Sequence, residues 1–225
     1  RQFNQINIEI LGTHDSCADA EIIILANEFL EKIITKKTFK LFINSLGDKN
    51  TIFKYKKNLT NYFEKYKNDL SEDSKSKIYS NPLRILDSKN KLDINLSINS
   101  PKIEKLYTTS AKQKFEEVQI LLSESNINFE INKNLVRGLD YYCHTVFEFK
   151  SESLGSQDTI IGGGRYDGLM KILGGPDIPG VGWASGVERL MMLSKKIDQD
   201  PVLVHVVILD DKFKSYGFHL INKLR

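Results

Sequence analysis

The stretch LVRGLDYY, residues 135–142, combines side chains that neither a buried strand nor an exposed loop normally carries together. A buried strand would not include both Arg137 and Asp140, because burying an unpaired charge is costly. An exposed loop would not place Leu139 between them. The combination places a cation beside a pair of tyrosines and indicates a functional site. Arg137 is therefore the first candidate site residue.

The composition is that of a globular protein and excludes several classes. Of 225 residues, 40% are hydrophobic and 27% are charged, which is ordinary for one or two soluble domains. No run approaches the roughly 18 apolar residues that span a bilayer. The two cysteines, Cys17 and Cys143, exclude a disulfide framework or a cysteine zinc site, so we expect a reducing compartment. The net charge of +3 favours an anionic partner only weakly.

The first residues alternate polar and apolar side chains as a half-covered strand does. The even positions 6, 8 and 10 are all isoleucine, whereas Gln5 and Glu9 share the polar face. Side chains two or four residues apart in a strand emerge on the same side of the sheet. An amide and an acid are therefore predicted to point in the same direction.

Helical and extended patterns follow. Ser16 and Asp19 resemble a capping box that opens a helix at about residues 18–34. Residues 39–45 read as a second strand, closed by a glycine-containing turn.

From residue 49 the residue pattern is typical of helices and is rich in lysine. Lysines alternate with aromatic and aliphatic side chains at helical spacing; those that we single out are Lys54, Lys56, Lys57, Lys65 and Lys67. By default such lysines form a solvated face, and contact with nucleic acid is the alternative. A helix is expected at about residues 110–123. We interpret residues 49–119 as a mostly helical insert between strands of one sheet.

Extended patterns return after the insert. The predicted strands are residues 128–131, 142–149, 158–164 and 179–186. Residues 187–196 then predict a helix with Val187, Leu190 and Met191 on one stripe. The apolar run at residues 202–209 is typical of a parallel strand buried on both faces. It leads into a helix at residues 212–225, as in the first unit of an α/β domain.

Two glycine-rich segments are candidate sites of close ligand approach. Residues 161–175 fail the dinucleotide pattern, because Asp167 stands at its last glycine, and fail the P-loop pattern, because Leu169 replaces its lysine. A tight strand-to-helix turn explains the glycines equally well. Residues 180–190 deliver Arg189 to a helix start, where an anion is favoured. An ordinary exposed Glu-Arg pair is the alternative.

Taken in order, these segments resemble the histidyl-tRNA synthetases, a family of class II aminoacyl-tRNA synthetases. RQFNQINIEILG resembles the end of class motif 2, and INSLGD and NPLRILDSK resemble the family's stretches around its insertion domain. LVRGLDYY and GGGRYDGL are similar to the two histidine signatures, which are its most specific motifs. GVGWASGVERL is similar to motif 3.

The resemblance implies an α+β fold, with a class II antiparallel sheet flanked by helices. It implies a catalytic core in two parts (residues 1–48 and 120–198), a helical insertion domain (49–119) and the start of an α/β anticodon-binding domain (199–225). Motif 1, which forms the family's dimer interface, and the motif 2 arginine that contacts ATP have no counterpart here. We therefore expect the isolated polypeptide to make no adenylate and to aggregate.

The implied activity is ATP-dependent ligation of L-histidine to histidine tRNA through a histidyl-adenylate. ATP is a substrate, and Mg²⁺ accompanies it. The full-length protein is expected to be a cytoplasmic homodimer. Neither a metal site formed by the protein nor contact with a membrane is expected. The residue roles carried over are Arg137 between the substrate carboxylate and the α-phosphate, Glu9 and Tyr142 on the imidazole, Gln5 towards the α-amino group, Tyr141 and Tyr166 lining the pocket, and Arg189 on the ATP phosphates. Asp140 is expected to orient the local backbone or the arginine. Leu139 and the strand behind it are expected to hold the arginine in a water-poor site.

Three other functions fit the same scaffold. One is a regulatory subunit of histidine biosynthesis that senses histidine, the second is a tRNA-sensing pseudo-synthetase domain, and the third is an ATP-dependent amide ligase. The presence of Arg137, Glu9, Tyr142 and Arg189 argues against the first two, because a sensor has no need of an α-phosphate arginine.

Overall fold

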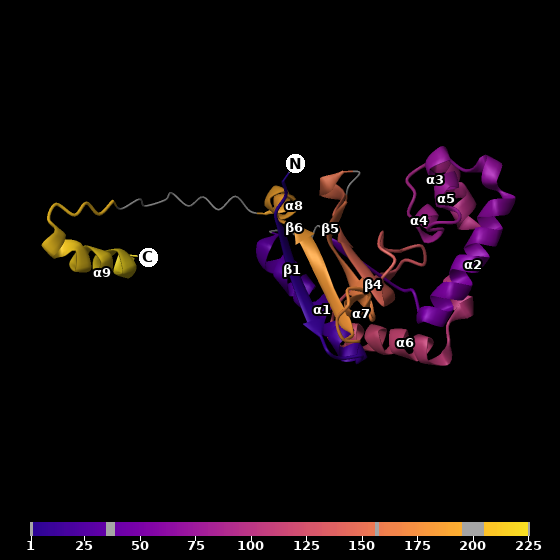
Figure 1. Cartoon of the computed structure of the whole chain (residues 1–225), viewed down its shortest axis with the longest axis horizontal. Helices are drawn as coiled ribbons and strands as arrows, with labels where there is room; N and C mark the ends of the chain where they lie inside the picture. Colours follow the sequence, from indigo (N-terminus) through magenta and orange to yellow (C-terminus); the bar gives the residue numbers. More distant parts are fainter. Residues whose placement is uncertain (1, 35–38, 156–157, 195–204, 225) are drawn as a thin grey trace. The chain divides into compact units, whose positions relative to one another are not determined.

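A computed structural model describes residues 2–34, 39–155, 158–194 and 205–224 (Figure 1). The chain divides into two compact units, Arg1–Lys195 and Lys196–Arg225. The first unit contains the sheet and the helices around it. The second unit contains the C-terminal helix and is described separately.

The first unit is built on a six-stranded sheet with the order β1-β6-β5-β4-β2-β3. The strands are β1 (Gln5–Leu11), β2 (Lys40–Ser45), β3 (Glu130–Ile131), β4 (Cys143–Lys150), β5 (Thr159–Arg165) and β6 (Gly180–Gly186). Every neighbouring pair is antiparallel except β2 and β3. The predicted antiparallel sheet is confirmed, although its shortest strand, β3, pairs along only two residues.

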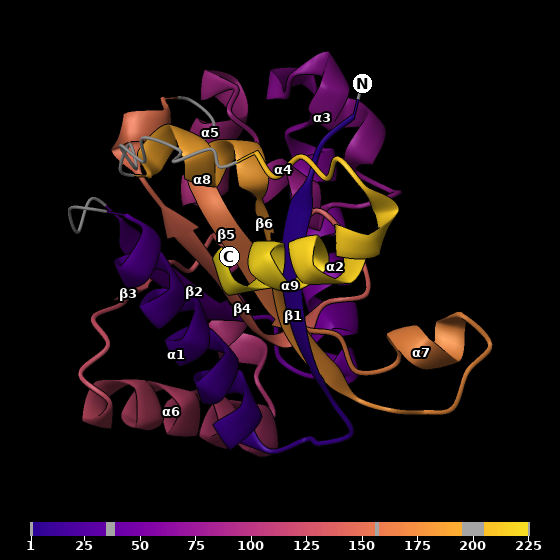
Figure 2. The same cartoon turned by 90° about the vertical axis from the view of Figure 1, so that its left-hand side faces the viewer.

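One face of the sheet is packed against α1 (Ser16–Ile33) and α6 (Thr109–Glu124). Both helices lie on the same side of the strands in Figure 2. The core between them contains Trp183, Phe147, Phe149 and Ile161, which are the inward positions of alternating strands. Because α6 packs on α1, this helix contributes to the core of the sheet, and the predicted domain boundary at residue 119 stays a prediction.

The start of α1 differs from the predicted capping box. Asp15 is the N-cap, and its carboxylate accepts a hydrogen bond from the Cys17 backbone N–H at 2.8 Å. Ser16 already lies within the helix. Asp19 turns inward and pairs with Arg165, because a carboxylate needed to neutralise a buried cation cannot also cap the helix. The prediction of Ser16 and Asp19 as a capping box was therefore wrong.

The opposite face of the sheet is partly covered by the insert. Its elements are α2 (Lys49–Lys65), η1 (Lys67–Asp69), α3 (Glu72–Lys77), α4 (Leu83–Leu86), α5 (Lys91–Ile98) and η2 (Ile103–Leu106), and the helices gather at one side of the unit in Figure 1. They enclose a second core, into which Leu135, Val136 and Val146 project from the sheet side. The insert thus packs over the β2–β4 end, and the β1–β6–β5 end keeps its polar side chains accessible.

Short elements complete this unit. They are η3 (Glu152–Leu154), α7 (Leu169–Ile172) and α8 (Val187–Leu193). In α8, Leu190 is buried as predicted, but Met191 is exposed. Met191 therefore does not belong to the buried face of the helix.

The C-terminal unit contains η4 (Asp211–Phe213) and α9 (Lys214–Leu224), which confirms the predicted helix. Residues 202–204 of the predicted parallel strand lie outside the described residues. The described part of that segment, residues 205–209, forms no strand, and Val207 and Leu209 are exposed. No strand of the described chain pairs with it, and an unpaired segment cannot form a ladder. Within the described residues, no helix has the length and apolarity needed to cross a membrane.

Candidate functional site

A pocket of about 380 Å³ opens on the accessible part of the sheet. We call it the tyrosine pocket; its lining includes Gln5, Asn7 and Glu9 from β1, Gly182 and Ala184 from β6, Leu169 and Met170 from α7, and Tyr141, Tyr142 and Tyr166 from the two signature segments. All five residues predicted to contact histidine therefore meet in one cavity. Arg137 and Arg189 are not among the residues that line it.

Strand register explains why Gln5 and Glu9 share this cavity. β1 is the edge strand, and Glu9 pairs with Gly182 of β6. A Cβ atom at Gly182 would overlap the Glu9 carboxylate. Glycine at this position therefore lets the acid lie flat across the neighbouring strand, so that it reaches into the pocket instead of projecting straight out of the sheet.

Three tyrosine rings form one wall of the pocket. The ring centroids of Tyr141 and Tyr142 are 4.7 Å apart, and those of Tyr142 and Tyr166 are 6.4 Å apart. The Tyr166 hydroxyl donates a hydrogen bond to the Glu9 carboxylate. Burial and the neighbouring Glu9 carboxylate raise the pKa of Tyr166, and burial raises the pKa of Tyr141 to about 12. Both phenols therefore remain protonated at neutral pH and can donate hydrogen bonds.

Arg137 lies next to this wall on a loop. Its Nη1 donates to Glu148 of β4 at 2.5 Å, and its guanidinium carbon lies 5.7 Å from the centre of the Tyr142 ring. A Cβ atom at Gly162 would overlap the guanidinium, so the arginine rests directly on the backbone of β5. Its Nε is buried and has no hydrogen-bond acceptor among the residues that the structure describes.

The surroundings of Arg137 differ from the sequence prediction at Leu139, and the expected role of Asp140 on the local backbone stays a prediction. Leu139 is 52% exposed, so it does not pack behind the arginine; Leu135 and Val136 do the anchoring. Asp140 forms an ion pair with Lys56 of α2 at 3.0 Å and does not contact the arginine. Glu148 was missed, although its position between Phe147 and Phe149 in an alternating strand could have shown that it faces away from the core.

Arg189 of α8 contacts the first residue of β5. Its Nη1 donates to the Thr159 carbonyl at 2.5 Å, and Glu188 accepts hydrogen bonds from the backbone and side-chain amides of Asn4. The predicted phosphate contact of Arg189 stays a prediction. No cluster of three or more His, Cys, Asp or Glu side chains suited to a metal ion occurs in the described ranges.

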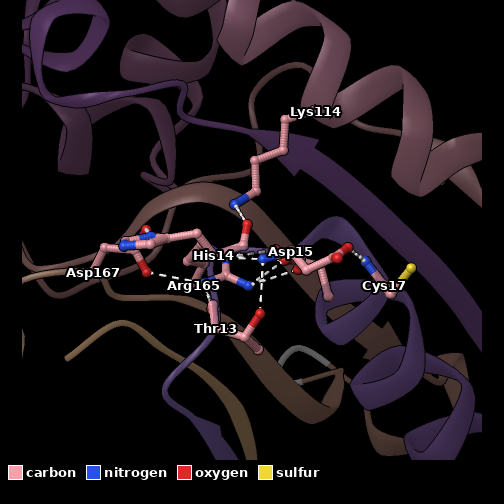
Figure 3. A network of polar contacts seen from close by, with 8 residues as sticks. Thr13, His14, Asp15, Cys17, Lys114, Arg165 and Asp167 are labelled. Carbon is pink, nitrogen blue, oxygen red and sulfur yellow. Dashed lines mark hydrogen bonds and ion pairs between the residues drawn. The ribbon is translucent and has the colours of Figure 1, made fainter.

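Sequence reasoning also missed Arg165, which organises one end of the site (Figure 3). This fully buried arginine forms ion pairs with Asp19 and Asp167, at 2.5 and 3.0 Å. It also donates to the carbonyl oxygens of Thr13 and Asp15, at 2.8 and 3.2 Å. The sequence did carry a signal for this role, because Arg165 is a charged residue at the end of a glycine-rich strand and directly precedes Tyr166.

The network around Arg165 extends to α6. Asp167 also pairs with His14 at 3.1 Å, and the ammonium group of Lys114 donates to the His14 carbonyl at 2.5 Å. The loop between β1 and α1 is thereby tied both to the end of β5 and to α6, as Figure 3 shows. Tyr166 follows Arg165 directly, so this network sets where the pocket tyrosine leaves the strand.

The mostly antiparallel sheet with a helical insert is the fold of the class II aminoacyl-tRNA synthetases. Within that class, the chain belongs to the histidyl-tRNA synthetase family, whose model matches residues 1–190. A histidine–tRNA ligase of Rippkaea orientalis is 46% identical over the whole chain, and one of Wolbachia pipientis is 45% identical. The chain covers 53% and 55% of these two proteins, so it spans about half the length of the curated relatives it matches.

Solved structures show the same fold. The apo histidyl-tRNA synthetase of S. aureus superimposes with a TM-score of 0.72 and 31% identity, over 100% of this chain and 56% of that protein. A Bacillus halodurans protein described as an ATP phosphoribosyltransferase regulatory subunit/histidyl-tRNA synthetase gives a TM-score of 0.55 at 22% identity. The match covers 86% of this chain and 54% of the Bacillus halodurans protein. At this level of identity it shows a similarity of fold alone.

The buried pair of Arg165 and Asp19 generates a stability prediction. We expect Asp19→Ala to lower the free energy of unfolding by about 3–5 kcal/mol, because the buried guanidinium loses one of its two counter-charges. Asp73→Ala is the matched control, since Asp73 pairs with Lys77 on the exposed surface of α3 and should cost less than about 1 kcal/mol. Urea unfolding followed by circular dichroism measures both, and equal losses would contradict a structural role for the buried pair.

Proposed function

We propose that the protein of which this chain is part ligates L-histidine to histidine tRNA, with ATP as the energy source and histidyl-adenylate as the intermediate. The observation that carries the proposal is the convergence of Gln5, Glu9, Tyr141, Tyr142 and Tyr166 on one pocket of about 380 Å³. Membership of the histidyl-tRNA synthetase family supports the same activity. The proposed homodimer and cytoplasmic location stay predictions.

In the first step, a carboxylate oxygen of histidine attacks the α-phosphorus of ATP, and pyrophosphate leaves. In the second step, a terminal ribose hydroxyl of the tRNA attacks the carbonyl carbon of the adenylate, and AMP leaves. Neither step needs a covalent bond to the enzyme, so positioning and charge stabilisation supply the rate enhancement.

The polar groups of the pocket suit an imidazole ring. A neutral imidazole has one N–H donor and one acceptor nitrogen, which point in different directions. Glu9 would accept from the N–H, and the Tyr142 hydroxyl would donate to the other nitrogen. The hydrogen bond from Tyr166 to Glu9 supports this arrangement, because it holds the carboxylate in a fixed orientation before histidine binds. Gln5 would then meet the α-amino group.

Arg137 would stabilise the negative charge that develops on the α-phosphate. One of its terminal nitrogens is held by Glu148, which would orient the guanidinium towards an anion. The buried Nε without an acceptor among the described residues supports the idea that a ligand completes its hydrogen bonding. A guanidinium can meet two oxygens at once, which an ammonium group cannot do.

ATP would lie between Arg137 and Arg189. Mg²⁺ would accompany it, held mainly through phosphate oxygens, as is usual for this ion. The sensor and pseudo-synthetase alternatives are not favoured, because the pocket combines imidazole-binding groups with an adjacent arginine suited to the α-phosphate. Histidine-dependent exchange of pyrophosphate into ATP by the full-length protein tests the proposal directly.

We expect Arg137→Ala in the full-length protein to lower the kcat of adenylate formation by about 10²–10³-fold, because one preorganised charge-stabilising group is lost. Gly162→Ala should act similarly, since the added methyl group displaces the guanidinium and its three nearest atoms all belong to Arg137. Lysine at position 137 should restore activity only in part. Single-turnover adenylate formation measures all three, and near-normal rates in Arg137→Ala would remove the proposed role.

Another prediction concerns amino-acid specificity. Glu9→Ala and Tyr142→Phe should weaken the use of histidine much more than the use of ATP, because each removes a polar partner of the ring. A site that hydrogen-bonds a substrate can discriminate by roughly 10⁴–10⁵ against analogues lacking those groups. Steady-state pyrophosphate exchange gives both Michaelis constants. A raised KM for ATP, with the histidine KM and kcat unchanged, would contradict this assignment.

A separate prediction concerns the lysines of the insert. Lys54, Lys57, Lys65 and Lys67 are exposed, whereas Lys56 is engaged with Asp140. Replacing the four exposed lysines by alanine should weaken tRNA binding and reduce the slope of log K against log salt by up to about 0.9 per lost phosphate contact. Adenylate formation should be unchanged, because it involves no tRNA. Identical salt slopes would assign these lysines to a solvated surface.

A further inference from the structure

The loop that carries Arg137 is held mainly by side chains. Residues 136–142, which lie between Leu135 and the start of β4, form no helix or strand, and their backbone makes a turn only at residues 140–141. Leu135 itself is fixed, because its carbonyl accepts from Asn44 at 2.9 Å and its side chain is buried. Beyond Val136 the backbone leaves the apolar core, and its position must be set by other contacts.

Arg84 of α4 provides one of these contacts. Its Nε donates to the Gly138 carbonyl at 2.9 Å, directly after Arg137. Arg84 is exposed, while its neighbours Leu83 and Ile85 are buried in the core of the insert. The arginine is therefore carried on a firmly packed turn, yet its guanidinium reaches outward onto the loop.

Lys56 of α2 provides the second contact. It forms the ion pair with Asp140 at 3.0 Å, immediately before Tyr141 and Tyr142. Its neighbour Tyr55 is buried in the insert core, so this lysine too projects from a fixed element. The insert thus grips the loop at residues 138 and 140, and the site residues Arg137, Tyr141 and Tyr142 lie on either side of these two points.

We propose that Arg84 and Lys56 are positioning residues of the aminoacylation site, through which the insert holds Arg137 over β5 and the two tyrosines over the pocket. The inference rests on the proposed function for its effect on catalysis, but the clamp itself is a property of the loop. Neither Arg84 nor Lys56 lines the tyrosine pocket. Each acts through the backbone or carboxylate that it holds.

The first test is kinetic and uses the full-length protein. Arg84→Ala should lower the kcat of adenylate formation by about 10–100-fold, because small displacements of catalytic groups are costly. In an Arg137→Ala background the same change should cost less than about twofold, since the group that Arg84 positions is already absent; contacting or coupled residues show such non-additivity. Arg84→Lys, which keeps one donor, should retain part of the activity. Lys56→Ala should mainly raise the KM for histidine.

Lys91→Ala is the matched control, because Lys91 is an exposed cation of the insert at the start of α5. Its kinetics and thermal midpoint should match those of the unmodified protein. If Arg84→Ala and Lys56→Ala behave like Lys91→Ala, the clamp is overturned. Equal losses from Arg84→Ala with and without Arg137 would overturn it too, since such losses indicate a general disturbance.

A second readout does not depend on catalysis. Trypsin cleaves after arginine, and loss of the clamp should speed cleavage between Arg137 and Gly138 in Arg84→Ala relative to Lys91→Ala, as followed by mass spectrometry. Cleavage after Lys133 should keep its rate, since the structure ties that segment to β2 through Asn44. Unchanged cleavage after Arg137 would contradict the clamp. Absence of histidine-dependent exchange in the unmodified protein would instead contradict the proposed function.

Discussion

A completely buried arginine constrains the end of the sheet where the tyrosine pocket forms. Arg165 has both counter-charges, Asp19 and Asp167, within 3.0 Å, because an uncompensated charge in the interior would cost several kcal/mol. Meeting this requirement brings together the loop after β1, the first turn of α1 and the residues that follow β5. The guanidinium needs hydrogen bonds as well as counter-charges, so the backbone carbonyls of that loop are drawn to it.

One face of the sheet forms the core, and the other carries the insert and the pocket. Alternation buries one set of side chains against α1 and α6 and sends the other set towards the insert and the pocket. On that second face, Gly162 and Gly182 leave room for the Arg137 guanidinium and the Glu9 carboxylate. The charged groups of the site can therefore lie against the backbone. Glu9 stays exposed, whereas the Arg137 side chain is 21% exposed, so the charge of the arginine acts more strongly than it would in open water.

Much of the fold and part of the candidate site could be predicted from the sequence. Strand alternation placed Gln5 and Glu9 on one face, and the histidine signatures indicated Tyr141, Tyr142 and Tyr166, which meet in one pocket. Other local inferences failed where a distant charge intervened. Asp19 does not cap its helix because Arg165, 146 residues away, needs it. The partner of Asp140 was not foreseen either, because Lys56, with which it pairs, lies 84 residues earlier in the chain.

The sequence by itself determined the strands of the sheet, the polar face of β1 and the family, since these depend on periodicity and on motifs that are contiguous in the chain. Tertiary structure alone decided which charges pair. The partner of Arg137 is Glu148, and the loop between them is held by Arg84 and Lys56 from the insert. Such choices depend on distances between segments that only packing brings together, and a charged side chain pairs with whatever opposite charge the folded chain places within its reach.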